Sequence, residues 1–300
     1  MKPVVKLYKF GRMSYFKTLI AQQVLSENLR RNLSRGSDFR GQAMDELAGS
    51  TRYDLSSPTG RSITNSLILV EHEPVYTIGL RTKDYKDDYL VSLRATLEQH
   101  KLKADFFKTN RGGLITFHGP GQLVAYPILY LGDFAEAVQR KSIKSYVNIL
   151  ETTIIDTLNR AGLTGAHTVR EYPGVWLGNG ERKIAFIGIS CKRYVTMHGL
   201  SINCDCELTW FDHIISCGLQ DKKITSIRQE LQPTVQKNCY STVQGMANRI
   251  GCNKSSVEHV ANQFCLSFSD RFCCSLLQEE FPWESVQCSV AEKKDKLNEN

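Results

Sequence analysis

The chain has 300 residues, of which 41% are hydrophobic and 23% are charged, and its formal net charge is +7. These values are typical of an ordinary globular protein, and every apolar run is shorter than the ~20 residues that a membrane-spanning helix needs, so we expect no membrane span. The positive charge favours an acidic partner protein and leaves nucleic acid open as a partner.

Much of the positive charge lies before residue 36. This segment holds a single acid, Glu27, and the basic residues Lys2, Lys6, Lys9, Arg12, Lys17, Arg30, Arg31 and Arg35. A basic, acid-poor start is typical of a mitochondrial transit peptide, and a basic surface on a first strand and helix explains it as well. We favour folded structure that carries an uncleaved or cryptic targeting signal.

The chain contains ten cysteines without an apolar signal peptide. This combination argues against a secreted disulfide scaffold and favours a reducing compartment with most thiols free. Cys204-x-Cys206 and Cys273-Cys274 lack a second spaced pair, so we expect no structural zinc site.

The first predicted elements are a strand and a helix. Apolar and basic residues alternate over Val4–Phe10, which indicates a strand, and apolar residues at helical spacing predict a helix from Tyr15 to Arg31. Residues 34–61 are rich in Ser, Gly, Arg and Asp, which indicates a surface insertion or a mobile loop. Ser66–Glu71 predicts a buried strand, and Val75–Ile78 continues in extended form after a proline.

The middle of the chain alternates short helices and strands, with apolar periods that fit each type. In chain order these are the helix Val91–His100, the strands Ala104–Lys108, Leu114–Phe117 and Gln122–Leu131, and a helix over Ile143–Leu158 that ends near Gly162.

The last third of the chain contains a strong hairpin signal at Asn179-Gly180. The predicted elements here are the hairpin strands Gly174–Leu177 and Lys183–Ser190, the strand Val195–Asn203, a second insertion over residues 235–252, a helix over Val257–Phe272 and a charged, disordered tail over residues 279–300. Strands and helices alternate without strict βαβ order. We therefore predict one α/β (α+β) domain over residues 1–278, with a mixed sheet flanked by helices.

The loop Arg111–Gln122 (RGGLITFHGPGQ) has the composition of a ligand-binding segment. Its glycines let backbone amides approach a ligand closely, and Arg111 and His118 add polar contacts; a tight turn between two strands is an equally good explanation. His72 ends a buried strand, where it either lines a cleft or is a core histidine with its hydrogen bonds satisfied.

Lys183 and Cys217 are the candidate reactive residues. Lys183 begins the apolar strand KIAFIGIS, so it either reaches solvent at the hairpin end or finds a partner. Cys217 lies between an apolar run and Gly218, at the end of an element. Composition alone does not single it out among ten cysteines, so these residues predict no more than a glycine-rich cleft with an option for cysteine chemistry.

Several segments, taken together and in order, resemble the lipoyl (octanoyl) transferase family of the animal mitochondrial type. They are Glu71–Gly79 (EHEPVYTIG), Arg111–Gln122, Arg182–Ile189, His198–Asn203 (HGLSIN), Ser216-Cys217-Gly218 and Ile224–Ile227 (ITSI). An ordered set of this kind is far more specific than a lone glycine-rich loop. The resemblance implies the fold of the biotin and lipoate protein ligases, a mixed sheet flanked by helices.

The resemblance also implies roles for single residues. Cys217 matches the cysteine that carries the acyl group, and Lys183 matches the lysine that lowers the pKa of this thiol and moves protons. The residues that match the substrate-binding segments are Arg111, Gly112, Gly113, Leu114, Ile115, Thr116, Phe117, His118, Phe186, Ile187, Gly188, Gly199, Leu200 and Ser201, with His72 and Tyr15 at the same cleft.

The implied reaction moves octanoyl from octanoyl-acyl carrier protein to a lysine of a lipoyl domain through acyl-Cys217, with no metal and no cofactor. The implied acceptors are the glycine cleavage H protein and the E2 subunits of 2-oxoacid dehydrogenases, and the implied location is the mitochondrial matrix. We expect a monomer that binds no nucleic acid.

Departures from the family pattern are the two insertions and Ser216, where proline is usual before the cysteine. Two rival functions stay open. An ATP-dependent lipoate- or biotin-type protein ligase needs a lysine but no acyl-accepting cysteine, and a non-catalytic module that binds lipoyl domains or carrier protein needs neither Cys217 nor Lys183.

Overall fold

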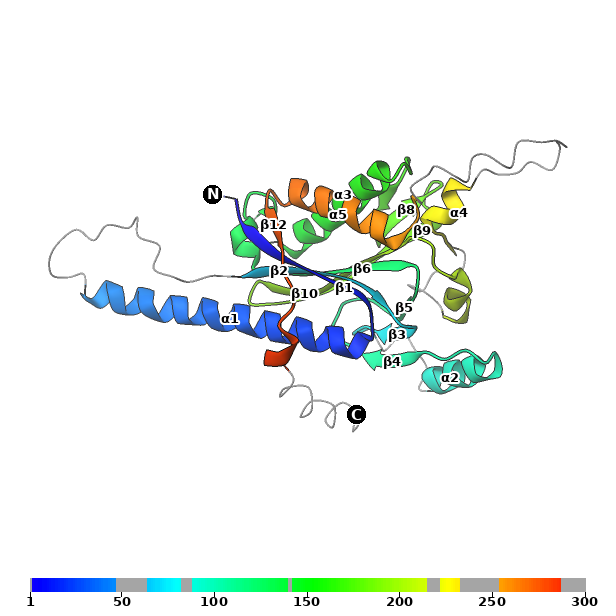
Figure 1. The fold of residues 1–300 in the computed structure, drawn as a ribbon, viewed down its shortest axis with the longest axis horizontal. Helices are drawn as coiled ribbons and strands as arrows, with labels where there is room; N and C mark the ends of the chain where they lie inside the picture. Colours follow the sequence, from blue (N-terminus) through cyan, green and yellow to red (C-terminus); the bar gives the residue numbers. More distant parts are fainter. Residues whose placement is uncertain are drawn as a thin grey trace.

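A large mixed sheet with helices on both faces forms the body of the molecule (Figure 1). The computed structural model describes residues 2–46, 64–81, 88–139, 142–214, 222–232 and 254–286. Within them the strands follow the spatial order β12 (Ser275–Gln278), β1 (Val4–Met13), β2 (Asn65–His72), β6 (Gln122–Ile128), β10 (Val195–Asn203), β9 (Arg182–Lys192), β8 (Tyr172–Leu177) and β7 (His167–Val169).

The sheet is parallel at one edge and antiparallel across the rest. The strands β12, β1 and β2 pair in parallel, and all pairs from β2 through β6, β10, β9 and β8 to β7 are antiparallel. The short strand β11 (Lys223–Ile224) pairs in parallel with the start of β9. The predicted mixed sheet is therefore confirmed.

The two faces of the sheet are both covered, which explains why its central strands read as continuous apolar runs. In β2, Leu67 and Leu69 pack in the cluster that contains α3 (Ile143–Arg160) and α5 (Val257–Arg271). Ile68 and Val70 point the other way and pack in the cluster that contains α1 (Tyr15–Glu46). This alternation follows from the period of two along a strand.

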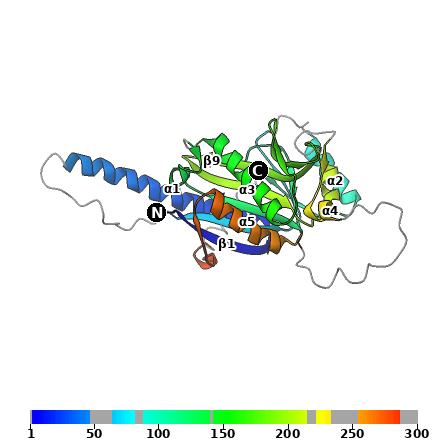
Figure 2. The ribbon, with the colours of Figure 1, turned by 90° about the horizontal axis from the view of Figure 1, so that it is seen from above.

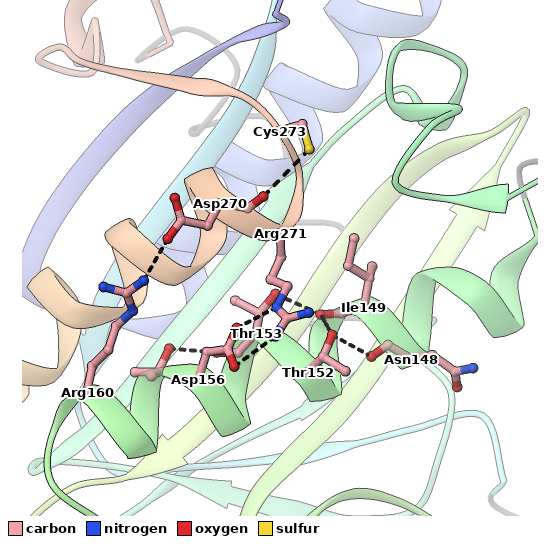
Figure 3. A network of polar contacts seen from close by, with 10 residues as sticks. Asn148, Ile149, Thr152, Thr153, Asp156, Arg160, Asp270, Arg271 and Cys273 are labelled. Atoms are coloured by element: carbon pink, nitrogen blue, oxygen red, sulfur yellow. Dashed lines mark hydrogen bonds and ion pairs between the residues drawn. The ribbon is translucent and has the colours of Figure 1, made fainter.

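The helices α3 and α5 lie side by side and are joined by ion pairs at their surface (Figure 3). Arg271 binds Asp156, and Arg160 lies 2.6 Å from Asp270. Each helix starts with a serine cap, Ser142 for α3 and Ser256 for α5, whose side chain accepts a backbone N–H of the first turn. The pair covers one face of the sheet.

A smaller sheet of order β4–β3–β5 extends the fold at the end of β2. Its strands are β4 (Asp105–Lys108), β3 (Val75–Ile78) and β5 (Thr116–His118). With α2 (Tyr89–Gln99) and the 3-10 helix η4 (Leu208–His213) it encloses a third apolar cluster. The remaining elements are η2 (Leu131–Phe134), α4 (Ile227–Leu231) and η6 (Trp283–Ser285). This small sheet carries the glycine-rich loop on one of its ends.

The hairpin predicted at Asn179-Gly180 is confirmed. Both residues have positive φ, 57° and 80°, and the strands on either side pair as Leu177 with Arg182. A two-residue turn of this type requires positive φ at both positions, which Asn and Gly tolerate best. The turn sets the register that puts Lys183 opposite Trp176.

The first helix is longer than predicted. It runs to Glu46 rather than Arg31, so residues 34–46 of the predicted insertion are helical, and α1 projects past the sheet (Figures 1 and 2). Extending an existing helix avoids the cost of nucleation, and residues such as Gln42, Ala43, Met44 and Glu46 have good helix propensity. Residues 47–61 lie outside the described residues.

Residues 279–286, which were predicted to belong to a disordered tail, are part of the folded structure. Phe281 and Val286 are buried in the cluster that contains α1, and Lys6 and Glu279 form an ion pair of 2.7 Å. Phe281 packs edge-on against Tyr8 with ring centroids 5.3 Å apart. The prediction of disorder followed the high charge content of this segment and overlooked its buried apolar residues Phe281 and Val286. The remainder of the tail and the predicted insertion at 235–252 lie outside the described residues.

Candidate active site

A cavity of about 920 Å³ opens among the main sheet, the small sheet and α3. Its volume falls in the usual range of small-molecule sites. Apolar side chains supply much of its wall, namely Leu114, Ile115, Val124, Val147, Phe186, Ile187, Ile189 and Leu200. A largely apolar hollow of this size suits a flexible hydrocarbon chain.

Two of the predicted binding segments lie next to each other on paired strands. In the β9–β10 register Phe186 faces Ser201, Ile187 faces Leu200 and Gly188 faces Gly199. All six residues line the cavity. A Cβ at Gly188 would lie 3.0 Å from Arg111 Cδ and 3.1 Å from Gly112 O, so the glycine permits the loop to approach the strand closely.

The glycine-rich loop is fastened to β9 and to β3. The backbone N–H of Gly112 donates to Ile189 O at 2.9 Å, and the Arg111 guanidinium donates to Thr77 O at 2.6 Å and to Gly112 O at 3.0 Å. Residues 111 to 116 and His118 line the cavity. Arg111 is 7% exposed, so it fixes the loop while keeping a positive charge beside the cavity.

Side chains of strand β5 alternate between the cavity and the apolar cluster behind it. Thr116 and His118 line the cavity, whereas Phe117 does not and stacks on Trp210 at a ring distance of 4.8 Å. The period of two along the strand accounts for this split. Phe117 was a predicted site residue, and it supports the cavity wall from behind.

Lys183 is buried at the cavity wall, with 2% exposure. Its Nζ donates to Pro173 O at 2.9 Å and lies 5.0 Å from the Trp176 ring centroid and 4.9 Å from that of Phe186. A carbonyl acceptor and aromatic faces are partners that suit an ammonium group. The expected alternative, a lysine that reaches solvent at the hairpin end, is wrong.

A histidine cluster, defined here as His72, His118 and His198, lies beside the cavity. Burial lowers the pKa of His72 to about 4, of His118 to about 3 and of His198 to about 4. The charge of Arg111 acts in the same direction on the pKa of His118 and His198. These imidazoles are therefore neutral at physiological pH.

Hydrogen bonds fix the tautomers of two of these histidines. His118 Nδ1 faces Gln122 Oε1 at 2.7 Å, and His72 Nδ1 faces Met13 O at 3.0 Å. Both partners are acceptors, since the Gln122 amide nitrogen donates elsewhere, so each Nδ1 carries the proton. His72 Nε2 then accepts from Tyr126 OH at 2.8 Å.

His72 does not line the cavity itself. It lies one layer behind, where it holds Tyr126, which does line it. Tyr15 lines the cavity from the first turn of α1, and burial raises the pKa of its hydroxyl. The hydroxyls of Tyr15, Thr116 and Ser201 are buried without a hydrogen-bond partner among the described residues. Their oxygen atoms are covered by the surrounding side chains.

Cys217 lies outside the described residues, but both ends of the segment that carries it are described. On one side, Ile214 N donates to Phe211 O at 3.2 Å, and Phe211 stacks on Phe186 at 5.3 Å. On the other side, Ile224 pairs with Lys183 across β11 and β9. The flanks of Cys217 therefore meet β9 at the two residues Lys183 and Phe186.

Several cavity residues were not in the predicted set. Tyr172 and Pro173 come from the start of β8, Glu171 from the turn before it, Tyr126 from β6, Thr77 from β3 and Tyr89 from α2. The sequence GVWL around Gly174 was the available signal for the β8 residues, and it indicated a strand rather than a site.

In the described part of the chain no helix is long and apolar enough to cross a membrane. Among the same residues, no group of three or more His, Cys, Asp or Glu side chains is arranged to hold a metal ion.

Residues 43–246 of the chain match the protein family described as "Lipoyl protein ligase A/B catalytic domain". The chain belongs to this family. Among curated relatives, the mitochondrial octanoyl-acyl-carrier-protein:protein N-octanoyltransferase of Danio rerio is 42% identical over 234 residues, covering 78% of this chain and 86% of the relative. The protein of the same description from Homo sapiens is 30% identical over 282 residues, 94% of this chain and 99% of that one.

The chain has the same fold as solved structures of lipoate protein ligases. A lipoate-protein ligase A bound with ATP superposes with a TM-score of 0.56 at 11% identity, covering 99% of this chain and 95% of that chain. A lipoate protein ligase from T. acidophilum with bound lipoic acid gives a TM-score of 0.56 at 12% identity, with 99% and 96% covered. The predicted family and the predicted ligase-like fold are confirmed.

Proposed function

We propose that this chain is an octanoyltransferase that moves an octanoyl group from acyl carrier protein to a lysine of a lipoyl domain, through a thioester on Cys217. Two relatives, matched over 99% and 86% of their own length, carry the octanoyltransferase name at 30% and 42% identity. The observation that carries the proposal is the buried Lys183 amine on the wall of a largely apolar cavity, on the strand that meets both flanks of the Cys217 segment.

The first half of the reaction is an exchange of thioesters. A free thiol has a pKa of ~8.5, so a neighbouring ammonium favours the reactive thiolate. Sγ of Cys217 attacks the carrier thioester carbonyl, the bond to the carrier sulfur breaks, and the carrier thiolate takes up a proton. One thioester replaces another, so the step is nearly neutral in energy.

The second half forms an amide. The lipoyl-domain lysine attacks acyl-Cys217 as a neutral amine, loses a proton and releases the Cys217 thiolate. The Lys183 amine is the group that receives and returns protons in both halves. The backbone amides of the glycine loop, whose residues Gly112 and Gly113 line the cavity, are the donors proposed for the oxyanion.

Selection of the acyl chain is hydrophobic. Burying seven methylene or methyl groups contributes on the order of 5 kcal/mol at ~0.8 kcal/mol each, before entropy losses. One methylene more or less changes affinity modestly, so the chain discriminates between neighbouring lengths in a graded way.

We further propose the partners and the location that the family resemblance implied. The donor is octanoyl-acyl carrier protein, and the acceptors are the lipoyl domains of the glycine cleavage H protein and of 2-oxoacid dehydrogenase E2 subunits. The chain acts as a monomer in the mitochondrial matrix; relatives at 41% and 42% identity carry the word mitochondrial in their names.

A transfer assay tests this function against the ligase alternative. Purified chain, octanoyl-acyl carrier protein and a lipoyl domain should give octanoylated domain at the same rate with and without ATP. Cys217→Ser should abolish transfer. The matched control is Cys191→Ser, which removes a partly buried free thiol on β9 and should leave transfer intact. Transfer that requires ATP and free octanoate, and that survives Cys217→Ser, would identify a ligase instead.

A further inference from the structure

Lys183 is connected to a carboxylate on α3 through one peptide group. Its Nζ donates to Pro173 O at 2.9 Å, and Gly174 N donates to Glu151 Oε1 at 2.9 Å. That carbonyl and that N–H belong to the same peptide unit. In a trans peptide they point in opposite directions, so the ammonium and the carboxylate bind its two ends.

Both ends of this connection are buried. Glu151 is 7% exposed and Lys183 is 2% exposed. Buried charges persist only where partners satisfy them, and opposite charges at the two ends of a peptide strengthen both hydrogen bonds. Burial raises the pKa of Glu151, while the Gly174 N–H and the charge of Lys183 act against that rise.

The peptide lies where β8 has lost its regular pairing. The register of β8 is irregular against β9 between Val175 and Trp176, and against β7 between Thr168 and Val169. The first residue of β8 that pairs with β9 is Val175, opposite Ala185, so Pro173 and Gly174 precede this pairing. Glu151 therefore supplies an acceptor that the ladder does not, and the Pro173 carbonyl is left to face the cavity amine.

The position of this peptide is also closely defined by its surroundings. Gly174 has φ +119°, and a Cβ there would lie 2.4 Å from Ala185 O and 2.9 Å from Lys183 Cε. Only glycine fits between β9 and the lysine stem. A small rotation of the peptide would move the carbonyl away from Nζ, so the hydrogen bond from Gly174 to Glu151 matters for the lysine.

We propose that Glu151 is a positioning residue for Lys183, which it holds in place through the Pro173–Gly174 peptide. The inference rests on the proposed role of Lys183 in proton transfer. Glu151 touches neither substrate nor reacting atoms; its acceptor oxygen orients the carbonyl that anchors the catalytic amine. The oxygen matters more than its charge, because the peptide requires an acceptor at a fixed distance.

Two conservative variants of Glu151 distinguish the effect of its acceptor oxygen from the effect of its negative charge. Glu151→Gln keeps an oxygen at the same distance and removes the charge, whereas Glu151→Asp keeps the charge and withdraws the oxygen by one methylene. The matched control is Asp156→Asn, which removes another carboxylate of α3 that pairs with Arg271 away from the cavity (Figure 3). Thermal unfolding of each variant verifies that it is folded.

The expected result for transfer is a loss in kcat with KM preserved. Glu151→Asp should lower kcat at least tenfold with KM for octanoyl-acyl carrier protein within twofold, because binding does not use Lys183. Glu151→Gln and Asp156→Asn should stay within about threefold of the native chain. A Gln variant as slow as the Asp variant, or an Asp variant as fast as the native chain, would overturn the proposal.

A second readout does not depend on activity. Acetic anhydride labelling of the folded chain, quantified at Lys183 by peptide mass spectrometry, reports how firmly the amine is held. Glu151→Asp should raise labelling at least fivefold, and Glu151→Gln should stay within twofold; unchanged labelling in the Asp variant would overturn the proposal. If Lys183→Met leaves transfer intact, the proposed catalytic role of Lys183 fails, while the labelling result still decides whether Glu151 positions it.

Discussion

The lysine wall, defined as Lys183 with its contacts Pro173, Trp176 and Phe186, and the histidine cluster are two polar regions at one cavity. Their buried polar groups have different kinds of partner. Lys183 has a carbonyl acceptor and two aromatic faces within reach, and a carboxylate lies one peptide further on. The histidines instead have neutral partners: a glutamine, a backbone carbonyl, a tyrosine and an asparagine.

The comparison indicates that the two regions have different roles: one suits proton transfer and the other suits structural support. Burial lowers the pKa of His72, His118 and His198 to about 4, 3 and 4, so these rings carry no charge at neutral pH and act as fixed hydrogen-bonding supports. The lysine region is built around a cation. We therefore propose that Lys183 transfers protons and that the histidines give structural support.

The largest expected effect comes from breaking the lysine wall. Lys183→Met keeps an unbranched apolar stem and removes the amine, so transfer should fall about 10²- to 10⁴-fold, the usual contribution of a general acid–base group. The assay is steady-state transfer to a lipoyl domain. Lys192→Met, at the exposed end of the same strand, is the control and should retain full activity. A Lys183→Met chain with native kcat would contradict the assignment.

The histidine cluster should make folding sensitive to acid. Each pKa is lower in the folded chain than the free value of ~6.5, so the unfolded chain binds more protons and stability falls as pH drops below about 6.5. At pH 5 each imidazole costs on the order of 2 kcal/mol, from about 1.4 kcal/mol per pH unit. Urea unfolding between pH 7 and pH 5 measures this slope.

One histidine can be removed from that titration to sharpen the comparison. In His72→Gln the amide can donate to Met13 O and accept from Tyr126 OH, so the fold is preserved while one titrating group is lost. The loss of stability between pH 7 and pH 5 should become smaller by on the order of 2 kcal/mol. An unchanged slope would show that His72 is already protonated or accessible.

The smallest effect is expected at the hydrogen bond between Tyr126 on the cavity wall and His72 behind it. Tyr126→Phe removes the hydroxyl that donates to His72 Nε2 at 2.8 Å, which should cost about 1 kcal/mol of unfolding free energy, the usual value of one hydrogen bond. Activity should change by less than tenfold, because neither group is assigned to chemistry. A loss of transfer comparable to that of Lys183→Met would move the histidine cluster into the mechanism.

Much of the fold was predictable because its signals are local. The apolar run of β2 and the turn residues Asn179-Gly180 led to a buried strand and a hairpin, and both are confirmed. The helix end at Glu46 and the ordered residues 279–286 were missed. In the tail, Phe281 and Val286 pack against residues far away in the sequence, which no local window reveals.

The segments that form the candidate site could be predicted from the sequence, whereas the orientation and contacts of single side chains could not. The strands carrying Phe186–Gly188 and Gly199–Ser201 pair in register, and the loop from Arg111 reaches the same cavity. The side on which Phe117 lies depends on the start of β5, which the sequence did not define. Glu151 had no signal at all, because its partner, the Gly174 amide, is brought to it only by the packing of α3 on β8.

The central claim is tested most directly by locating the acyl group in the absence of an acceptor. The chain is incubated with octanoyl-acyl carrier protein alone, and peptide mass spectrometry follows with and without hydroxylamine. We predict one octanoyl group on the peptide that contains Cys217, removed by hydroxylamine and present without ATP. An octanoyl group on another residue, or none on Cys217 while transfer proceeds, would contradict the mechanism.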